Sequence, residues 1–565
     1  MLEGDIQDPK VSHVNSIIGD EYRWPTTVPY YLEGSLEMNA KGVVLKAFDQ
    51  YRLKTCIDFT PWNGEENYIS VFKGSGCYSY VGNRHVGKQQ LSIGSNCDSL
   101  GTVEHEFLHA LGFWHEQSRA DRDDYVNIMW DQIESGKEHN FNTYDDTVSS
   151  SLGVPYDYSS VMHYSKTAFN TGSDPTIVTN IPHFMDIIGQ RMGFSENDLT
   201  KLNRLYNCTT SSTFVDSCDF EEENICGMIQ GSSQWEWKRH RSVDGGPQTD
   251  STNRGECEGK GFFMHLSTGS AQAGERASLE SRWLYPKSGP QCLQFFLHNS
   301  AAPDDVLNIW VKEYGQEPKL FKSISGGVMG SWELHNIDLE VTKKARVVLE
   351  GVRGNSPSSG GFSVDDINLS SAKCPQHVWH VHNITGLLAS TPAGQKLYSP
   401  RFLSPAGYSF QYRLVAPTAL PMTSGPNDPN LKWPCPWQQA TMVLMDQQSD
   451  IRQQMNMHRM ITTDPNKMSS DGTEFFWDDP SKVGSKVTTA DGSFYYRGPG
   501  YGTSTFITHS RLKSRRFIKG DDAFFLFSLD GLSHFAIGSM DGVVVENTDG
   551  FTDVSAHRRV DTKLS

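Results

Sequence analysis

Apolar and polar positions follow two different patterns along the chain, and the change between them divides it into parts. In the first part, stretches with helical spacing are mixed with short runs that are typical of strands. The spacing predicts helices over 39–55, 100–111, 124–133 and 199–205, and strands over 56–59 and 68–72. Ser195 and the polar residues after it are expected to cap the last of these helices. The first part is therefore a domain in which helices and strands are mixed.

The pattern changes at Cys218, where short alternating runs between Gly, Ser and Pro clusters begin. Such runs are typical of all-β sandwiches, and they occur at 293–297, 307–311, 345–349, 408–412 and 523–527. A Ser/Thr-rich stretch before them predicts a linker. The predicted division is a short polar start 1–14, a first domain 15–208, a linker 209–217, two sandwich domains 218–374 and 375–535, and a tail 536–565 without a clear pattern.

Length and charge restrict the class of protein. A chain of 565 residues is too long for one core and favours three domains. Its formal net charge of −17 disfavours a nucleic-acid or anionic-membrane partner. The start has no apolar signal region, and no run of about 18 apolar residues follows, so neither a signal peptide nor a membrane span is expected in this sequence. Ten cysteines and three glycosylation sequons nevertheless indicate an extracellular route; the sequons are at Asn207, Asn368 and Asn383.

The helix predicted at 100–111 carries the clearest candidate chemistry. His105 and His109 are four residues apart, so they share one helical face and can offer two nitrogens to one metal ion. Gly112 can end the helix and turn the chain so that His115 supplies a third nitrogen. Three imidazoles favour Zn²⁺ and leave one position open, which is the catalytic arrangement. Glu106 lies beside this site rather than on the metal. An amphipathic helix with three chance histidines is the alternative that the extended spacing disfavours.

A second motif, Ser160-Val161-Met162-His163-Tyr164, places a methionine about fifty residues later, where a metzincin peptidase needs a Met-containing turn. With both motifs, the region 15–208 resembles the astacin family of zinc endopeptidases, which have an α+β metzincin fold. Two further modules resemble those of the meprins within that family. The region 218–374, which ends in Phe362-Ser363-Val364-Asp365-Asp366-Ile367, is similar to a MAM domain. The region 375–535 is similar to a MATH (TRAF-like) domain, with Leu397-Tyr398-Ser399-Pro400-Arg401-Phe402 and Gly498-Pro499-Gly500-Tyr501-Gly502-Thr503-Ser504.

The resemblance implies roles for the residues around the three histidines. Glu106 would be the general base and then the proton donor to the leaving amine, and Tyr164 would bind the developing oxyanion. Met162 would form an apolar floor under the imidazoles. Glu116 would receive the mature amino terminus at Asn15 through a buried contact.

The residues before Asn15 resemble the end of a propeptide, in which an aspartate keeps the enzyme latent. Asp5, in Leu2-Glu3-Gly4-Asp5, is the candidate inhibitory ligand. The resemblance also implies an activating protease. One departure concerns that step, because Val14 rather than Arg or Lys precedes Asn15.

Substrate preference follows from the predicted charges of the cleft. The stretch Gly189-Gln190-Arg191 resembles one near the primed side of the cleft, where Arg191 would pair with an acidic side chain after the scissile bond. Lys137 is a second candidate cation.

The cysteines alone do not define their pairing. Four lie in the first domain and allow three connectivities, whereas five in the second leave one that is either free or intermolecular. The family pairing implies Cys56 with Cys208, Cys77 with Cys97, Cys218 with Cys226, and Cys292 with Cys374. Cys257 then matches a cysteine that bridges two subunits, which implies a disulfide-linked homodimer through the MAM domain. Cys435 is expected to be free and buried.

The predicted function is that of a zinc-dependent endopeptidase, made as a zymogen, that cleaves proteins and peptides near acidic residues. The alternative is a catalytically silent adhesion protein that acts through its MAM and MATH domains. The intact zinc motif, Glu106 and Met162 disfavour that alternative.

Overall fold

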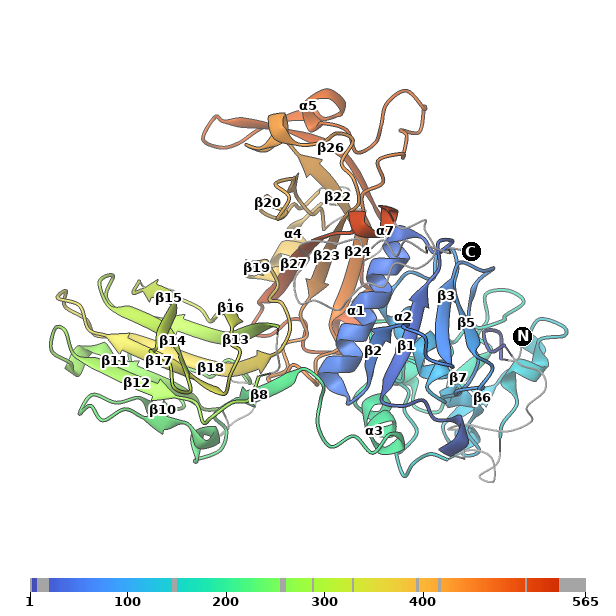
Figure 1. Cartoon of the computed structure of the whole chain (residues 1–565), viewed down its shortest axis with the longest axis horizontal. Helices are drawn as coiled ribbons and strands as arrows, with labels where there is room; N and C mark the ends of the chain where they lie inside the picture. Colours follow the sequence, from blue (N-terminus) through green and yellow to red (C-terminus); the bar gives the residue numbers. More distant parts are fainter. Residues whose placement is uncertain are drawn as a thin grey trace, which may run out of the picture.

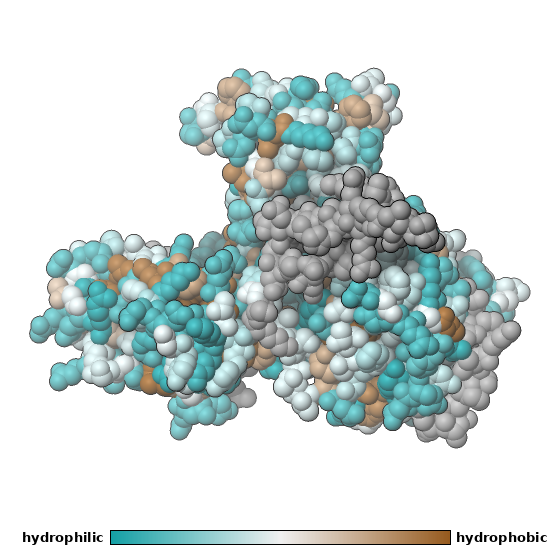
Figure 2. All heavy atoms as spheres, in the orientation of Figure 1, coloured by the Kyte–Doolittle hydropathy of each residue, from teal (hydrophilic) through white to brown (hydrophobic). Residues whose placement is uncertain are grey.

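The computed structural model describes residues 3–7, 20–144, 150–254, 261–286, 289–327, 330–392, 396–414, 418–503 and 506–537. Figure 1 shows three lobes, with the first domain on the right, the second on the left and the third rising between them. Hydrophilic residues cover most of the visible face, with small apolar groups between them, as on most globular surfaces (Figure 2). Within the described residues, the structure contains no helix with the length and apolar character of a membrane span.

A five-stranded sheet and three helices organise the first domain. The strand order is β2-β1-β3-β5-β4, in which β4 alone runs antiparallel to its neighbour. The strands are β1 Thr27–Leu32, β2 Asp58–Pro61, β3 Tyr68–Phe72, β4 Cys77–Tyr78 and β5 Lys88–Ile93, and the helices are α1 Met38–Lys54, α2 Leu100–Ala110 and α3 Glu196–Leu205. Apolar side chains of α1 and α2 form one core with the sheet, so the sheet fixes the position of α2.

The helix predicted over 124–133 is wrong. The chain forms η3 Arg122–Asp124, then β6 Val126–Ile128, then η4 Trp130–Gln132. β6 pairs antiparallel with β7 Ile177–Thr179, and its side chains alternate between buried and exposed positions. The apolar residues therefore form the buried face of a strand, in which alternate side chains point the same way. Pairing with β7, some fifty residues later, stabilises this strand. The strand predicted at 56–59 begins two residues later, at Asp58, and Cys56 before it is joined to Cys208 by a disulfide.

The second domain is a sandwich of two antiparallel sheets. One has the order β10-β11-β18-β13-β16 with β8 also on β18, and the other has the order β15-β14-β17-β12-β9. The strands are β8 Phe214–Cys218, β9 Ile229–Gln230, β10 Lys238–His240, β11 Phe263–Ser267, β12 Arg276–Glu280, β13 Pro290–Asn299, β14 Val306–Glu313, β15 Lys319–Ser325, β16 Glu333–Glu340, β17 Ala345–Val352 and β18 Gly361–Ser370. The inward residues of both sheets form one core, as the alternating pattern predicted.

The third domain is also built from two antiparallel sheets, of order β19-β27-β23-β24 and β20-β21-β22-β26-β25. Its strands are β19 His377–Val381, β20 Phe402–Leu403, β21 Ser409–Phe410, β22 Thr418–Thr423, β23 Gln438–Leu444, β24 Met457–Thr462, β25 Ser485–Thr488, β26 Phe494–Thr503 and β27 Ala523–Gly531. Short helices lie between these strands and after the last one: α4 Ile384–Ser390, α5 Pro480–Val483, α6 His509–Leu512 and, after β27, α7 Ser533–Ile537.

The third domain contacts both of the others. Its strand β24 packs on α1 of the first domain, and Lys54 at the end of α1 donates a 2.5 Å hydrogen bond to the carbonyl of Gln454. On the other side, an apolar cluster joins the second and third domains. That cluster comprises Phe263, Phe296, Trp332, Leu334, Met445, Phe524 and Leu526.

Candidate metal centre

The three histidines of the zinc motif converge on one point. α2 places His105 and His109 one above the other, with their Nε2 atoms 3.1 Å apart. The helix ends at Ala110, and Gly112, with φ of 109°, turns the chain back. His115 then brings its ring to 5.2 Å from that of His105 between ring centroids. All three side chains are buried.

The outer nitrogens of the first two rings are occupied, which leaves the inner ones for a metal. His105 Nδ1 lies 2.8 Å from the Val161 carbonyl, and His109 Nδ1 lies 2.7 Å from the Phe113 carbonyl. A carbonyl only accepts a hydrogen bond, so these Nδ1 atoms donate and the Nε2 lone pairs face the centre. Burial and the charge of Arg191 lower the pKa of His105 to about 4, which keeps this ring neutral as a metal ligand must be. The donor set therefore fits Zn²⁺.

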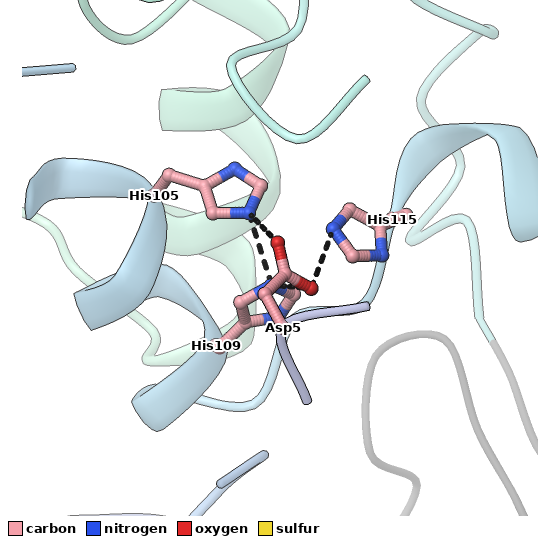
Figure 3. Close-up of side chains that lie close together, drawn as sticks. All are labelled: Asp5, His105, His109 and His115. Atoms are coloured by element: carbon pink, nitrogen blue, oxygen red, sulfur yellow. Dashed lines mark hydrogen bonds and ion pairs between the residues drawn. The ribbon is translucent and has the colours of Figure 1, made fainter. Parts of the chain in front are cut away.

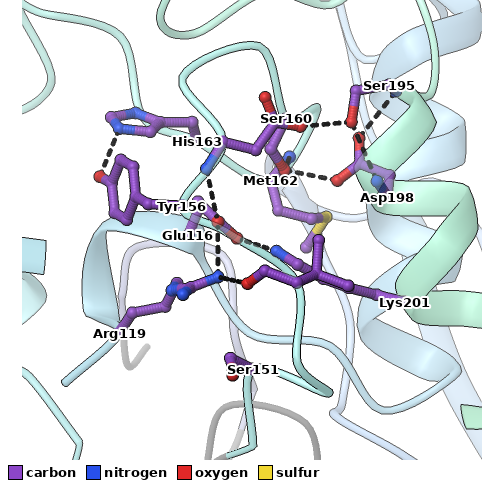
Figure 4. A network of polar contacts seen from close by, with 12 residues as sticks. Glu116, Arg119, Ser151, Tyr156, Ser160, Met162, His163, Ser195, Asp198 and Lys201 are labelled. Atoms are coloured by element: carbon purple, nitrogen blue, oxygen red, sulfur yellow. Dashed lines mark hydrogen bonds and ion pairs between the residues drawn. The ribbon is translucent and has the colours of Figure 1, made fainter. Parts of the chain in front are cut away.

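The turn that contains Met162 is fixed by the helix that follows it. Asp198 accepts a hydrogen bond from Ser160 Oγ at 2.5 Å and from the Val161 amide at 2.8 Å (Figure 4). Asp198 also completes the capping box of α3 with Ser195, as the sequence predicted. Met162 is buried in the core of the first domain. Because the Val161 carbonyl holds His105, the cap of α3 positions a predicted metal ligand.

The two candidate catalytic groups lie next to the histidines. Glu106 is buried, and burial together with the charge of Asp5 raises the pKa of its carboxyl well above the ordinary range. The ring of Tyr164 packs 4.5 Å from that of His115 between centroids. Burial also raises the pKa of the Tyr164 phenol, which stays protonated and donates a hydrogen bond to the carbonyl of Glu3.

The segment 3–7 lies across the centre. Asp5 Oδ2 is 3.2 Å from His105 Nε2, and Asp5 Oδ1 is 3.7 Å from His109 Nε2 and 3.3 Å from His115 Nε2 (Figure 3). Burial opposes ionisation of Asp5, but the three imidazoles hold the pKa of this carboxyl well below its usual range. The backbone of the segment pairs with Ser79, next to the edge strand β4. Asp5 thus occupies the open side of the three-histidine centre.

Glu3 also contacts the centre, although no motif in the sequence singled it out. Its buried side chain accepts a 2.5 Å hydrogen bond from His115 Nδ1 and a 2.7 Å bond from Ser118 Oγ. The carboxylates of Asp5 and Glu3 raise the pKa of His115 to about 9 against the effect of burial, with Asp5 contributing more than Glu3. Gly4 between them has φ of 82°, and a Cβ there would lie 2.5 Å from the Phe169 ring. The signal that could have pointed to Glu3 is the acidic residue on each side of Gly4 in the sequence.

Glu116 is buried among cations. Lys201 Nζ lies 2.5 Å from Glu116 Oε2, and Arg119 donates to Oε1 at 3.2 Å (Figure 4). The backbone amide of Asp157 donates a further bond to Glu116 Oε1 at 3.0 Å. Asn15, the expected partner of Glu116, lies outside the described residues. Sequence reasoning missed Lys201. The lysine lies on the buried side of the closing helix α3, and which side is buried becomes known only when the packing of α3 is known.

The structure separates the two predicted substrate-binding cations. The backbone of Arg191 lies against α2, where a Cβ on Gly101 would come within 2.3 Å of its carbonyl oxygen. The Arg191 guanidinium donates to the His163 carbonyl at 3.2 Å, and its charge acts to lower the pKa of Glu106. Arg191 is thus at the centre. Lys137 is exposed in a surface turn, where its amide bonds to the Glu134 carbonyl.

Four disulfides occur among the described residues, and they join Cys56 to Cys208, Cys77 to Cys97, Cys218 to Cys226, and Cys292 to Cys374. Cys435 is a free, buried thiol. Cys257 lies outside the described residues.

The predicted glycosylation sites differ in accessibility. Asn207 and Asn383 are exposed, although the Asn383 side chain also caps α4. Asn368 in β18 is 3% exposed, and its amide donates a 2.7 Å hydrogen bond to the Ser449 carbonyl of the third domain. Glycosylation at Asn368 therefore stays a prediction, at a position that the third domain covers in this structure.

Comparison with known proteins matches each domain to a family. Residues 16–207 match the model of the astacin peptidase family, residues 218–375 match the MAM domain (meprin/A5/mu), and residues 376–529 match the MATH domain. Human meprin A subunit beta is 59% identical over 546 residues, covering 94% of this chain and 78% of that relative. Mouse meprin A subunit alpha is 43% identical over 553 residues, covering 94% and 73%. The solved structure of the medaka (Oryzias latipes) hatching enzyme HCE-1, a zinc protease, is 38% identical, covers 34% of this chain and 97% of its own, and has a TM-score of 0.32.

The three-histidine centre on a metzincin domain, followed by two β-sandwiches, defines a multidomain zinc metalloendopeptidase. The chain belongs to the meprins of the astacin family.

Proposed function

We propose that this chain, with the segment 3–7 in place, is a latent endopeptidase that cleaves peptide bonds near acidic residues once the segment is removed. The observation that carries the proposal is the position of Asp5, within 3.7 Å of all three histidines. An activating protease would have to cut between this segment and Asn15. Release would also remove Glu3 from His115 and free the Tyr164 hydroxyl.

One zinc ion per catalytic domain would be held by His105, His109 and His115. When bound, it supplies a Lewis acid that polarises the scissile carbonyl and lowers the pKa of water. Glu106, buried beside the histidines, would accept a proton from water and pass it to the leaving amine. The protonated Tyr164 hydroxyl would donate a hydrogen bond to the developing oxyanion.

The acidic preference rests on Arg191. Its guanidinium lies beside the centre and interacts with the charges of Asp5 and Glu106. Asp5 leaves with the segment, so a carboxylate of the substrate can take over this favourable interaction. Lys137, on a surface turn, stays a weaker candidate for the same role.

The assembly and location that we propose follow the meprin relatives. The chain would act outside the cell, on protein and peptide substrates, as a homodimer linked through Cys257. Non-reducing gels test this link, because Cys257→Ser should run as a monomer and wild type as a dimer. Equal mobility of both proteins without reductant would contradict it.

The test of the activity compares four samples on a quenched peptide with acidic residues. These are the chain before processing, the processed chain, the processed chain with a zinc chelator, and processed Glu106→Gln. Only the untreated processed chain should cleave. Near-normal turnover by Glu106→Gln that still binds zinc would refute the assigned base, and full activity before processing would refute latency.

A further inference from the structure

Two histidines and two carboxylates lie together where the second and third domains meet. Glu333 begins β16 of the second domain, and His380 lies in β19 of the third. His382 follows on the same side as His380, because side chains two apart in an extended chain point the same way. Asp522, just before β27, completes the group. Figure 1 shows β16 and β19 beside each other at this junction.

Both imidazoles are oriented in the same manner between the two carboxylates. His380 Nδ1 lies 3.0 Å from Glu333 Oε2, and His382 Nε2 lies 4.0 Å from Glu333 Oε1. The other nitrogen of each ring faces Asp522, with His380 Nε2 at 3.2 Å from Oδ2 and His382 Nδ1 at 3.2 Å from Oδ1. Each ring thus offers one nitrogen toward Glu333. Asp522 Oδ1 can accept a hydrogen bond from His382 Nδ1, and Asp522 Oδ2 forms an ion-pair contact with His380 Nε2.

This geometry is that of metal-binding histidines with a supporting carboxylate. A ligating imidazole commonly donates its remote N–H to a carboxylate, which fixes its tautomer and orientation. Asp522 is placed for that supporting role toward His382, and it lies 3.2 Å from His380 Nε2. Arg254 Nη1, 3.2 Å from Asp522 Oδ2, further favours Asp522 as a supporting group rather than a ligand. One ligand atom from each of Glu333, His380 and His382 lies within 4.8 Å of the other two.

The surrounding packing holds the group in place before any ligand binds. The His380 ring stacks on Phe524 with centroids 4.2 Å apart. Phe524 belongs to the apolar cluster that joins the two domains. The side chain of His380 is 7% exposed, whereas that of His382 is 58% exposed, so the group is anchored on one side and open to solvent on the other.

We propose that Glu333, His380 and His382 bind a second divalent transition-metal ion of the zinc class, remote from the catalytic centre. Two imidazoles and one carboxylate suit Zn²⁺ among the common metals, and the open side leaves a position for water. The ligands come from two domains, so the ion links the second domain to the third.

Counting zinc ions per chain tests the proposal. Full-length wild type and variants are dialysed against the same zinc-buffered solution near pH ~7.5, and metal is measured by mass spectrometry against protein concentration. Wild type should hold about two zinc ions per chain and His382→Gln about one. His377→Gln, on the same strand β19 but outside the group, is the matched control and should hold about two.

A second variant and an activity assay separate this site from the catalytic one. Glu333→Gln should also hold about one ion, and thermal unfolding of wild type should shift upward with zinc more than that of either variant. Processed His382→Gln should keep its peptidase activity, since its catalytic centre is intact. One zinc ion in wild type, or two in His382→Gln, would overturn the second site and leave the peptidase proposal standing.

Discussion

Lys201 and Glu116 form a buried ion pair, with 2.5 Å between Lys201 Nζ and Glu116 Oε2. Glu116 follows His115 directly, and Lys201 lies in the closing helix α3. The pair therefore ties the end of the zinc motif to the last helix of the domain. The family resemblance implies that Glu116 contacts the mature amino terminus at Asn15. The Glu116 carboxylate would then bind both that terminus and Lys201.

Removing Lys201 should destabilise the first domain. Lys201→Met leaves a buried carboxylate with less compensation, which costs about 3 kcal/mol for a broken buried pair. That corresponds to a fall in its melting temperature on the order of 10 °C, measured by calorimetry on the unprocessed chain. Lys166→Met is the matched control, because its pair with Asp186 is exposed and contributes under about 1 kcal/mol. Equal melting temperatures of Lys201→Met and Lys166→Met would show that the buried ion pair contributes no more to stability than the exposed one.

Gly4→Ala should weaken latency. Alanine at φ of 82° costs about 1–2 kcal/mol, and its Cβ would press on the Phe169 ring. The fraction of chains with the segment 3–7 displaced should rise about 5- to 30-fold at such a cost. Cleavage of the quenched peptide by unprocessed protein should rise by the same factor.

Gly34→Ala serves as the control for Gly4→Ala, because a Cβ there meets no atom within 4 Å. Adding Glu106→Gln to Gly4→Ala should abolish the signal and so exclude a contaminating protease. Unchanged basal activity of Gly4→Ala would mean that the seating of Asp5 does not depend on this glycine.

Arg191→Gln should change specificity rather than general activity. Loss of a charged hydrogen-bond partner costs about 1.5–3 kcal/mol, so kcat/KM for a peptide with an acidic residue should fall about 10- to 100-fold. The neutral analogue of the same peptide should be cleaved at nearly the wild-type rate. Lys137→Gln, on the exposed turn, should have the smaller effect. An equal loss on both peptides would instead assign Arg191 a role in holding the His163 loop.

The parts of the site that were predictable are those encoded by local spacing. His105 and His109 share a helical face whatever the rest of the chain does, and Ser195 caps its own helix. The same reasoning failed at 124–133, because Val126 and Ile128 are buried by pairing with a distant strand. Local pattern does not record which partner a short apolar run will find.

Contacts between distant residues were not predictable from the sequence. Glu3 reaches His115 only because the segment 3–7 pairs with Ser79. Asn368 carries a valid sequon, yet docking of the third domain buries it. Glu333 and His380 are likewise brought together by the apolar cluster between domains. Each of these contacts depends on how folded elements pack against each other, and a sequence motif does not contain that information.

His458 should make the stability of the third domain depend on pH. Burial, with smaller effects from the charges of Lys54 and Lys46, lowers the pKa of its imidazole to about 3. The unfolded chain binds this proton near pH ~6.5, whereas the folded chain excludes it. The stabilising contribution is therefore complete above about pH 6.5 and is lost progressively as the pH falls from there toward about 3. Between pH ~6.5 and ~5 the loss reaches about 2 kcal/mol.

Calorimetry on unprocessed wild type and His458→Asn at several pH values checks this dependence. The melting temperature of the third domain should fall more steeply in wild type, by a difference of about 4–8 °C between pH ~6.5 and ~5. His139→Asn is the control, because His139 is exposed in the first domain and should leave the wild-type slope unchanged. Parallel slopes for wild type and His458→Asn would show that the imidazole keeps its ordinary pKa in the folded chain, and that its packing in β24 beside α1 does not exclude the proton.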